Sequence, residues 1–225
     1  HSGYEHQWME DSDASAMAGD FSGMQQSGSF IVHPPVGKLL IAAGIRVFGF
    51  TSFGFRVSSV LIGCALILVV FFLTRRLSRS TMVGAIAAVL LSLDGLHFTM
   101  SRIALLDIFQ AFFTVAAVLT LVIDRDWFRA RLARYLERHE LPDLGGGFGP
   151  IVLWRPWRLA SGMLFGLACA TKWSSVYVLA VFSVLSVLWD LGARRLAGAG
   201  GKSPFSLLTD APVALIYQDK DDNPD

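Results

Sequence analysis

The chain has 225 residues, of which 53% are hydrophobic and only 16% are charged, and its formal net charge is +1. Charged residues make up about a quarter of an ordinary soluble domain. The composition of this chain therefore excludes an ordinary soluble domain and favours a membrane protein. No CxxC, HExxH, Walker A or GxGxxG motif stands in the right context, so we expect no metal site and no cofactor.

Residues 1–55 are predicted to form an external loop that contains an interfacial helix. Their start is polar and no signal peptide or membrane segment precedes it, so we predict that the chain is a fragment. In "HPPVGKLLIA" (33–42), two prolines fix an extended approach and favour a helix start. This arrangement would hold His33 and Lys38 at the membrane surface, or it is simply a rigid turn before the helix.

Apolar runs then predict about five transmembrane helices in a bundle over 56–190, because a span needs about 20 apolar residues. The run 159–189 is interrupted only by Lys172 and is long enough for two short spans. Residues 124–156 are predicted to be a cytoplasmic loop that begins with a basic amphipathic helix, and 191–225 a cytoplasmic tail. The predicted helices lie near 57–74, 80–100, 103–123, 157–171 and 174–190.

The distribution of Lys and Arg predicts the orientation of these spans. Cytoplasmic segments carry an excess of both residues near the spans, and here one side carries thirteen and the other five, with Lys220 near the C-terminal end left out of the count. We therefore expect a multi-pass protein of the plasma membrane, with the N-terminal segment external and the C-terminus cytoplasmic. The richer side has Arg75, Arg76, Arg79, Arg125, Arg129, Arg131, Arg134, Arg138, Arg155, Arg158, Arg194, Arg195 and Lys202, and the poorer side Lys38, Arg46, Arg56, Arg102 and Lys172.

The stretch "SLDGLHFTMSRIALLD" (92–107) keeps four ionisable residues between two apolar runs. Ionisable groups are costly at membrane depth, so we expect them to have a function. Asp94, His97 and Ser101 have the i, i+3, i+7 spacing of one helix face. Asp94 as a helix cap, His97 as an interfacial residue and Arg102 as a snorkelling anchor remain alternatives.

In this topology the unusual polar residues gather at the outer ends of the helices. A basic cluster at the outer membrane boundary suits a phosphate on a lipid carrier, because Arg and Lys pair well with phosphate oxygens. The predicted cluster consists of His33, Lys38, Arg56, Asp94, His97, Arg102, Asp107 and Lys172.

Five motifs occur in a characteristic order: "HPPVGKLLIA", "FRVSSVLIG", "LDGLHFTMSRIALLD", "RPWR" and "GLACATKWS". Together they resemble the protein O-mannosyltransferase family, dolichyl-phosphate-mannose–protein mannosyltransferases, in its bacterial form, over about residues 28–190. The resemblance implies an all-α, polytopic integral membrane protein with a partial GT-C fold. It also implies inverting transfer of mannose from polyprenyl-phosphate-mannose to Ser or Thr of secreted proteins. Membrane lipid and the protein export machinery are further candidate partners, and no nucleic acid is expected.

Matching the family's motifs assigns candidate roles. Arg56 matches an arginine at the start of the second helix, and we expect it, Arg102 and Lys172 to contact the donor phosphate. Asp107 would hold one of these cations in place. The matched residues are His33 and Lys38 in HPP-x-x-K, Arg102 and Asp107 in SR-x-x-L-L-D, and Lys172 and Trp173 in TKW.

The family's catalytic Asp-Glu pair would lie upstream of His1, so the catalytic residue of this chain is unknown. The N-terminal carboxylates lack the family's aromatic context and are interpreted as solvated loop charges. They are Glu5, Glu10, Asp11 and Asp13.

Three alternatives remain open. The first is another GT-C enzyme that transfers a polyprenyl-phosphate sugar to a lipid or glycan. The second is a transporter or membrane scaffold, which the lack of an internal repeat and of polar residues at the midplane disfavours. The third is a non-functional gene remnant.

Overall fold

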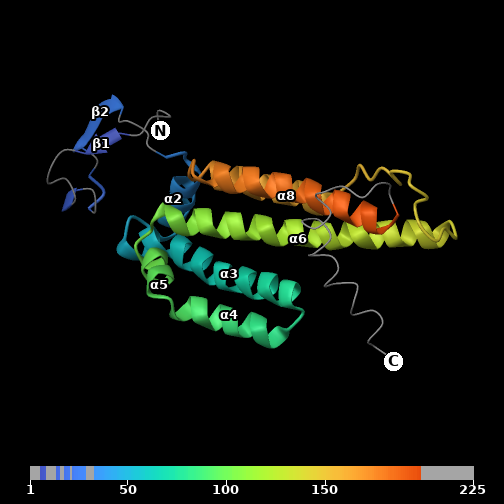
Figure 1. The fold of residues 1–225 in the computed structure, drawn as a ribbon. Helices are drawn as coiled ribbons and strands as arrows, with labels where there is room; N and C mark the ends of the chain where they lie inside the picture. Colours follow the sequence, from blue (N-terminus) through green and yellow to red (C-terminus); the bar gives the residue numbers. More distant parts are fainter. Residues whose placement is uncertain (1–5, 9–13, 16–17, 21, 29–32, 199–225) are drawn as a thin grey trace. The chain divides into compact units, whose positions relative to one another are not determined.

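The computed structural model describes residues 6–8, 14–15, 18–20, 22–28 and 33–198. Most of these residues are helical, and the short strands β1 (His6–Trp8) and β2 (Met24–Gly28) pair antiparallel. The predicted helical, polytopic membrane class is therefore confirmed, with this strand pair as an addition. The helices are α2 (Val36–Phe48), α3 (Ser52–Ser78), α4 (Thr81–Leu93), α5 (Gly95–Arg102), α6 (Leu106–Arg138), α7 (Pro156–Cys169) and α8 (Ser175–Leu196) (Figure 1).

Fewer helices than expected are long enough to span a membrane. Within the described residues, α3, α6 and α8 qualify by length and composition, and the bent pair α4–α5 is a fourth candidate. Helix α7 has 14 residues. That is about 21 Å of helix, which is shorter than a hydrocarbon core of about 30 Å. The described chain thus has three or four candidate spans, where the sequence predicted about five.

The predicted helix 80–100 is broken at Asp94, where the axis bends by 61°. The backbone N–H of Asp94 donates to Leu91 O over 3.2 Å, and its carboxylate accepts from His97 N at 2.7 Å. Such side chains compete with the hydrogen bonds of a helix interior and favour caps, and Gly95 follows directly. Asp94 therefore caps α5, and the expectation that it shares a helix face with His97 and Ser101 is corrected.

Helix α6 is longer than predicted. The apolar run ends at Ile123, but the helix continues through Arg138. No Gly or Pro occurs between Ile123 and Pro142, and Arg, Ala, Leu and Glu are good helix formers. The predicted amphipathic helix of the cytoplasmic loop is therefore the C-terminal half of α6 and not a separate element.

The chain divides into two compact units, which are described separately. The first comprises residues 1–116 and 164–176. In it, α3 and α4 form an antiparallel pair, and α2 and α5 also pack on α3 (Figure 1). Its buried core consists of Ile41, Leu66, Ala104, Ile108, Phe109, Phe113 and Ala168.

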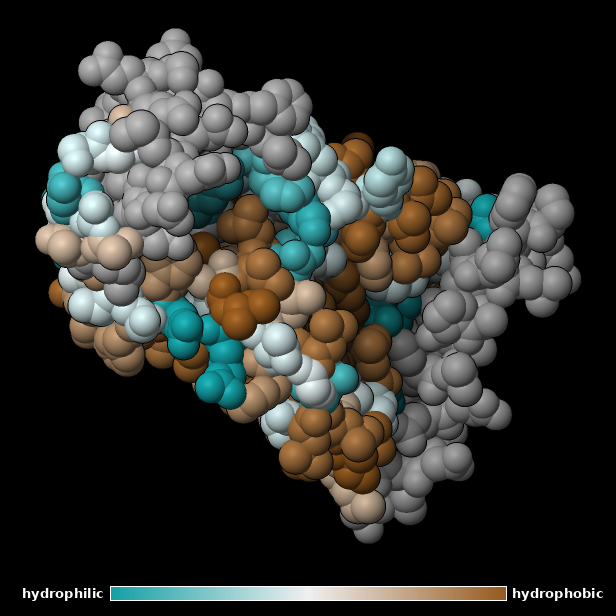
Figure 2. All heavy atoms as spheres, turned by 90° about the vertical axis from the view of Figure 1, so that its left-hand side faces the viewer, coloured by the Kyte–Doolittle hydropathy of each residue, from teal (hydrophilic) through white to brown (hydrophobic). Residues whose placement is uncertain are grey.

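Large apolar side chains also cover the outside of these helices. Leu61 and Leu68 of α3 and Leu90 of α4 are all exposed. Figure 2 shows hydrophobic residues (brown) at the surface beside hydrophilic ones (teal). Monomeric soluble proteins rarely expose large contiguous apolar patches, whereas lipid chains would cover this one.

Helices α3 and α5 approach closely at Gly63, where an added Cβ would lie 2.9 Å from Ser101 Cβ. We expect Gly63→Ala to lower the free energy of unfolding by about 1–2 kcal/mol, because overpacking outweighs the gain in helix propensity. Unfolding by denaturant in detergent micelles measures this change.

Gly162 of α7 is the matched control, since an added Cβ there meets nothing within 4 Å. Gly162→Ala should leave stability unchanged or raise it by up to about 1 kcal/mol. Equal effects of the two substitutions would show that the contact at Gly63 does not constrain α5.

Candidate functional site

Arg56 and Arg102 line one open cavity of about 260 Å³ in the first unit. Arg56 lies in the second turn of α3 and Arg102 ends α5, so the packing of α5 on α3 brings them together. Both side chains are exposed, and the Arg102 guanidinium lies 5.0 Å from the ring centroid of Phe98. Two of the three predicted phosphate contacts therefore share a cavity.

The N-terminus of α3 forms another wall of this cavity through Ser52 and Phe53. Thr51 caps the helix, accepting from Gly54 N at 3.1 Å. The first backbone N–H groups of a helix have no acceptor within it and carry a partial positive charge. A helix N-terminus beside two guanidinium groups is an arrangement that binds phosphate.

The length of α3 places this cavity near a membrane boundary. Arg56 and Arg75 are 19 residues apart on the same helix. This spacing is about 28 Å at 1.5 Å per residue, close to the hydrocarbon thickness of about 30 Å. When Arg75 and Arg76 lie at one boundary, Arg56 lies at the other.

A second polar group is the ion pair between Lys172 and Asp107. Lys172 Nζ donates to Asp107 Oδ1 over 2.6 Å, and the two side chains are 28% and 42% exposed. Lys172 lies in the turn between α7 and α8, and Asp107 lies in the first turn of α6, where a negative charge is favoured. The cation beside Asp107 is thus Lys172, which does not line the Arg56–Arg102 cavity.

The "HPPVGK" motif contacts the same turn. Val36 N donates to Ala170 O over 3.0 Å, and Lys38 Nζ donates to His33 O over 3.3 Å. An added Cβ at Gly37 would lie 2.7 Å from Leu106 and 3.0 Å from Thr171. Only glycine allows α2 to approach the starts of α6 and the α7–α8 turn so closely.

Other predicted site residues lie elsewhere. Asp94 is an exposed cap, and His97 is only 9% exposed, on the side of α5 that meets Gly63. Ser101 Oγ donates to His97 O over 2.8 Å. Trp173 is 67% exposed in the α7–α8 turn. None of Asp94, His97 and Trp173 lines the Arg56–Arg102 cavity.

Within the described part of the chain, no group of three His, Cys, Asp or Glu side chains could hold a metal ion. The four N-terminal carboxylates, Glu5, Glu10, Asp11 and Asp13, fall outside the described residues. The catalytic carboxylate therefore stays unassigned.

The sequence analysis missed a polar cluster in the second unit, which comprises residues 117–163 and 177–225. Arg155 and Arg158 share hydrogen bonds of 2.5 to 3.2 Å with Asp124 and Asp190. Asp124 is fully buried, and the Arg155 side chain is 9% exposed. We call these four residues the ion network. A sequence signal existed, since each Asp ends a long apolar run.

The ion network ties α6, the segment before α7, α7 and α8 together. Its two positive and two negative charges balance, and each guanidinium contacts both carboxylates. The Arg155 guanidinium also lies 4.4 Å from the ring centroid of Phe128. A buried group that is satisfied in this way fixes packing and is not open to a ligand.

Comparisons with known proteins find relatives over the part of the chain that contains these motifs. Residues 32–131 match the family described as dolichyl-phosphate-mannose-protein mannosyltransferase. Over 170 residues the chain is 48% identical to a polyprenol-phosphate-mannose–protein mannosyltransferase of Mycobacterium tuberculosis, covering 73% of this chain and 31% of that protein. The protein of the same name in Mycolicibacterium smegmatis is 44% identical over 165 residues, which cover 73% of this chain and 32% of that protein. In Corynebacterium glutamicum the identity is 39% over 185 residues, which cover 82% of this chain and 35% of that protein. The chain thus spans about a third of the length of these relatives, and no solved structure matches it significantly.

Proposed function

The chain belongs, through residues 32–131, to the dolichyl-phosphate-mannose-protein mannosyltransferase family, and on that premise we propose that the complete protein is a protein O-mannosyltransferase. The family resemblance seen in the motifs is thereby confirmed. The proposed reaction transfers mannose from polyprenyl-phosphate-mannose to Ser or Thr hydroxyls of secreted proteins at the external membrane face. One observation carries this proposal: Arg56 and Arg102 line the same cavity at the N-terminal end of α3.

The proposed role of this cavity follows from the charge that develops in the reaction. The acceptor hydroxyl attacks the anomeric carbon of mannose, loses its proton to a carboxylate and inverts the configuration. The bond from that carbon to the phosphate oxygen breaks, and the lipid phosphate leaves with the electron pair. Its negative charge rises as it leaves. Arg56, Arg102 and the first N–H groups of α3 would therefore stabilise the transition state more than the bound donor.

Lys172 is the proposed third cation, and Asp107 is its positioning residue. Lys172 does not line the Arg56–Arg102 cavity, but it is predicted to lie at the same membrane boundary. In the complete protein we therefore expect Lys172→Gln to lower the rate of mannosyl transfer by about 10-fold, less than the loss of either cavity arginine. Asp107→Asn should have a smaller effect in the same direction. Kinetic constants measured with purified protein test both changes.

The double variant Asp107→Asn with Lys172→Gln tests whether Asp107 acts by positioning Lys172 or independently of it. If Asp107 acts through Lys172, adding Asp107→Asn to Lys172→Gln should cause little further loss, because residues in contact are not additive. Lys172→Arg should retain part of the rate. Fully multiplicative losses would exclude the positioning role.

The predicted topology is part of the proposal. Residues 1–55 would be external, and 124–156 and 191–225 cytoplasmic. This orientation puts Arg56 and Asp107 on the side where exported chains emerge, and the export machinery would deliver the acceptor there. Labelling single cysteines at Ser52 and Ser78 with a membrane-impermeant reagent tests it. If intact cells were labelled at position 78 and not at position 52, the orientation would be opposite to the proposed one.

Transfer of labelled mannose from polyprenyl-phosphate-mannose to a Ser/Thr-rich peptide tests the function. Membranes with the complete protein should label this peptide but not the same peptide with Ala at every Ser and Thr. Label that appears only in lipid or glycan would favour the alternative GT-C reaction. The absence of any transfer would contradict both.

A further inference from the structure

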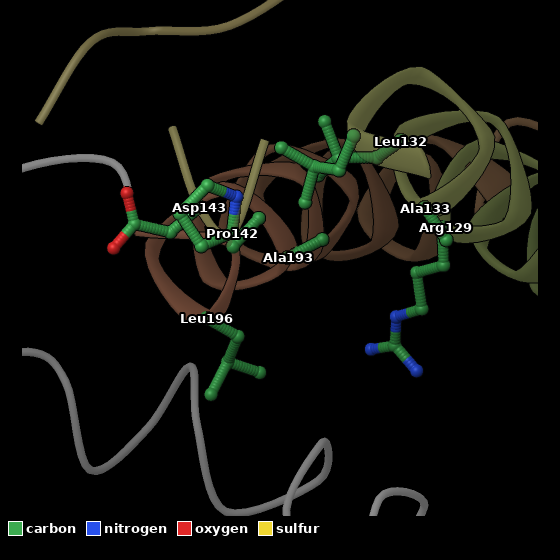
Figure 3. Close-up of a pocket in the computed structure, with 9 residues that line it drawn as sticks. Arg129, Leu132, Ala133, Pro142, Asp143, Ala193 and Leu196 are labelled. Atoms are coloured by element: carbon green, nitrogen blue, oxygen red, sulfur yellow. The ribbon is translucent and has the colours of Figure 1, made fainter. Parts of the chain in front are cut away.

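The C-terminal half of α6 has two distinct faces. Leu132 and Ala133 on one face line a pocket of about 240 Å³ together with Ala193 and Leu196 of α8 (Figure 3). Arg129 comes from the same part of α6 and also lines this pocket. This face therefore lies beside α8 within the second unit, with Leu132 buried there.

The other face carries three arginines at i, i+3 and i+7. Arg131, Arg134 and Arg138 are exposed and line an open cavity of about 370 Å³ together with Tyr135 and the segment 150–154. At about 100° per residue, Glu137 and Glu140 point away from the middle of this face. Across the described parts of the chain, no carboxylate forms a salt bridge with these three arginines. The cavity therefore has an unbalanced positive wall.

The opposite wall is apolar and strongly exposed. Ile151 is 76% exposed, Leu153 91% and Trp154 69%. Tryptophan prefers the headgroup level of a bilayer, and apolar side chains of this size prefer lipid to water. The cavity thus combines cations with a surface that favours lipid.

Helix length puts this cavity at the headgroup level. A hydrocarbon core of about 30 Å corresponds to about 20 residues of α6. If Asp107 lies at the outer boundary, the hydrocarbon core therefore ends near Trp127. Arg131 then lies about 6 Å further along the helix and Arg134 about 10 Å, whereas each headgroup layer is about 5–7 Å thick. Arginine side chains extend far enough to keep both guanidinium groups within this layer.

Two contacts orient these guanidinium groups. The Arg131 guanidinium lies 4.8 Å from the ring centroid of Trp127. Arg134 Nε donates to Ala130 O over 3.1 Å, and its Nη1 and Nη2 atoms have no hydrogen-bond partner among the described residues. Guanidinium groups bind phosphate oxygens in pairs, and an ordered fork loses less entropy on binding.

We propose that this cavity binds the headgroup phosphate of an anionic phospholipid in the leaflet opposite to Arg56. Arg131 and Arg134 contact the phosphate, Arg138 adds positive potential, and Leu153 and Trp154 contact the glycerol and upper acyl region. The proposal is independent of the mannosyl transfer, since it concerns the other membrane face.

Lipid binding to the 225-residue chain in neutral phosphatidylcholine nanodiscs tests the proposal. Short-chain phosphatidylglycerol is titrated and its dissociation constant is measured by native mass spectrometry, with phosphatidylcholine of equal chain length and inorganic phosphate as separate arms. We expect phosphatidylglycerol to bind in preference to both. Arg131→Gln with Arg134→Gln should weaken its binding about 30-fold, because each basic residue at an anionic surface contributes about 1 kcal/mol.

Arg75→Gln with Arg76→Gln is the charge-matched control, since these arginines end α3 and are expected at the same leaflet. This control should weaken phosphatidylglycerol binding less than about threefold, because these two arginines do not line the cavity and exposed charges are screened by salt. If both double variants weakened phosphatidylglycerol binding equally, the binding would be general attraction to a basic surface, and the proposed site would be wrong. Binding of inorganic phosphate as tight as that of phosphatidylglycerol would also overturn it.

Discussion

Replacing Arg56 by Ala in the complete protein is expected to lower the rate of mannosyl transfer by about 10²- to 10³-fold, the usual loss when one donor to a developing anion is removed. Arg102→Ala should have a similar effect. Both guanidinium groups line the same cavity, and the charge of the departing phosphate rises during the reaction. The loss should therefore appear mainly in kcat and less in KM. Steady-state kinetics with polyprenyl-phosphate-mannose and a Ser/Thr peptide measure both constants.

Arg75→Ala is the matched control for these variants. Arg75 is an exposed arginine in the last turn of α3, about 28 Å along this helix from Arg56, and does not line the cavity. Its replacement should leave transfer within about threefold of the unchanged protein, because a distant exposed charge is screened. Membrane insertion should be intact in all three variants. Rates like those of the unchanged protein in both Arg56→Ala and Arg102→Ala would exclude the cavity as the phosphate site.

The largest expected effect on stability is at Asp124. Replacing it by Asn keeps the shape but removes one of the two negative charges of the ion network, so a positive charge is left buried with Arg155 and Arg158. Breaking a buried pair in this way costs about 3–5 kcal/mol. Unfolding in detergent, followed by circular dichroism against denaturant concentration, should show this loss.

Glu137→Gln is the control on the same helix. Glu137 is exposed near the C-terminal end of α6, so its replacement should change the free energy of unfolding by about 0.5 kcal/mol or less. Adding Arg158→Gln to Asp124→Asn restores the charge balance and should recover part of the stability. If Asp124→Asn costs no more than the control, the ion network does not hold the second unit together.

The helical membrane class and the family could be predicted because both depend on local signals. Long apolar runs specify spans without any knowledge of tertiary contacts, and the motif order identifies the family. The ends of the helices could not be predicted equally well from these local signals. The break at Asp94 depends on one capping hydrogen bond, and nothing in the apolar pattern shows that α6 continues past Ile123 as one helix. The roles of the site residues stay predictions.

Contacts between distant segments could not be predicted from the sequence. Grouping by membrane side put Asp94, His97, Arg102 and Lys172 in one predicted cluster, and of these four only Arg102 lines the cavity with Arg56. Arg102 joins Arg56 because α5 lies on α3, whereas Lys172 pairs with Asp107 across the starts of two other helices. The ion network escaped notice because its arginines were counted only as positive charges. The carboxylates that balance them lie far away in the sequence.

The most direct test of the central claim is where the donor binds. A photoactivatable polyprenyl-phosphate-mannose would be cross-linked to the 225-residue chain in membranes, and the labelled peptides would be mapped by mass spectrometry. We predict label on the segment Ser52–Val60 and on the end of α5 around Arg102, which carry the residues that line the cavity. This label should be competed by unlabelled donor and lost in Arg56→Ala with Arg102→Ala. Competable label confined to the second unit, or label unchanged in that double variant, would contradict the assignment of the phosphate site.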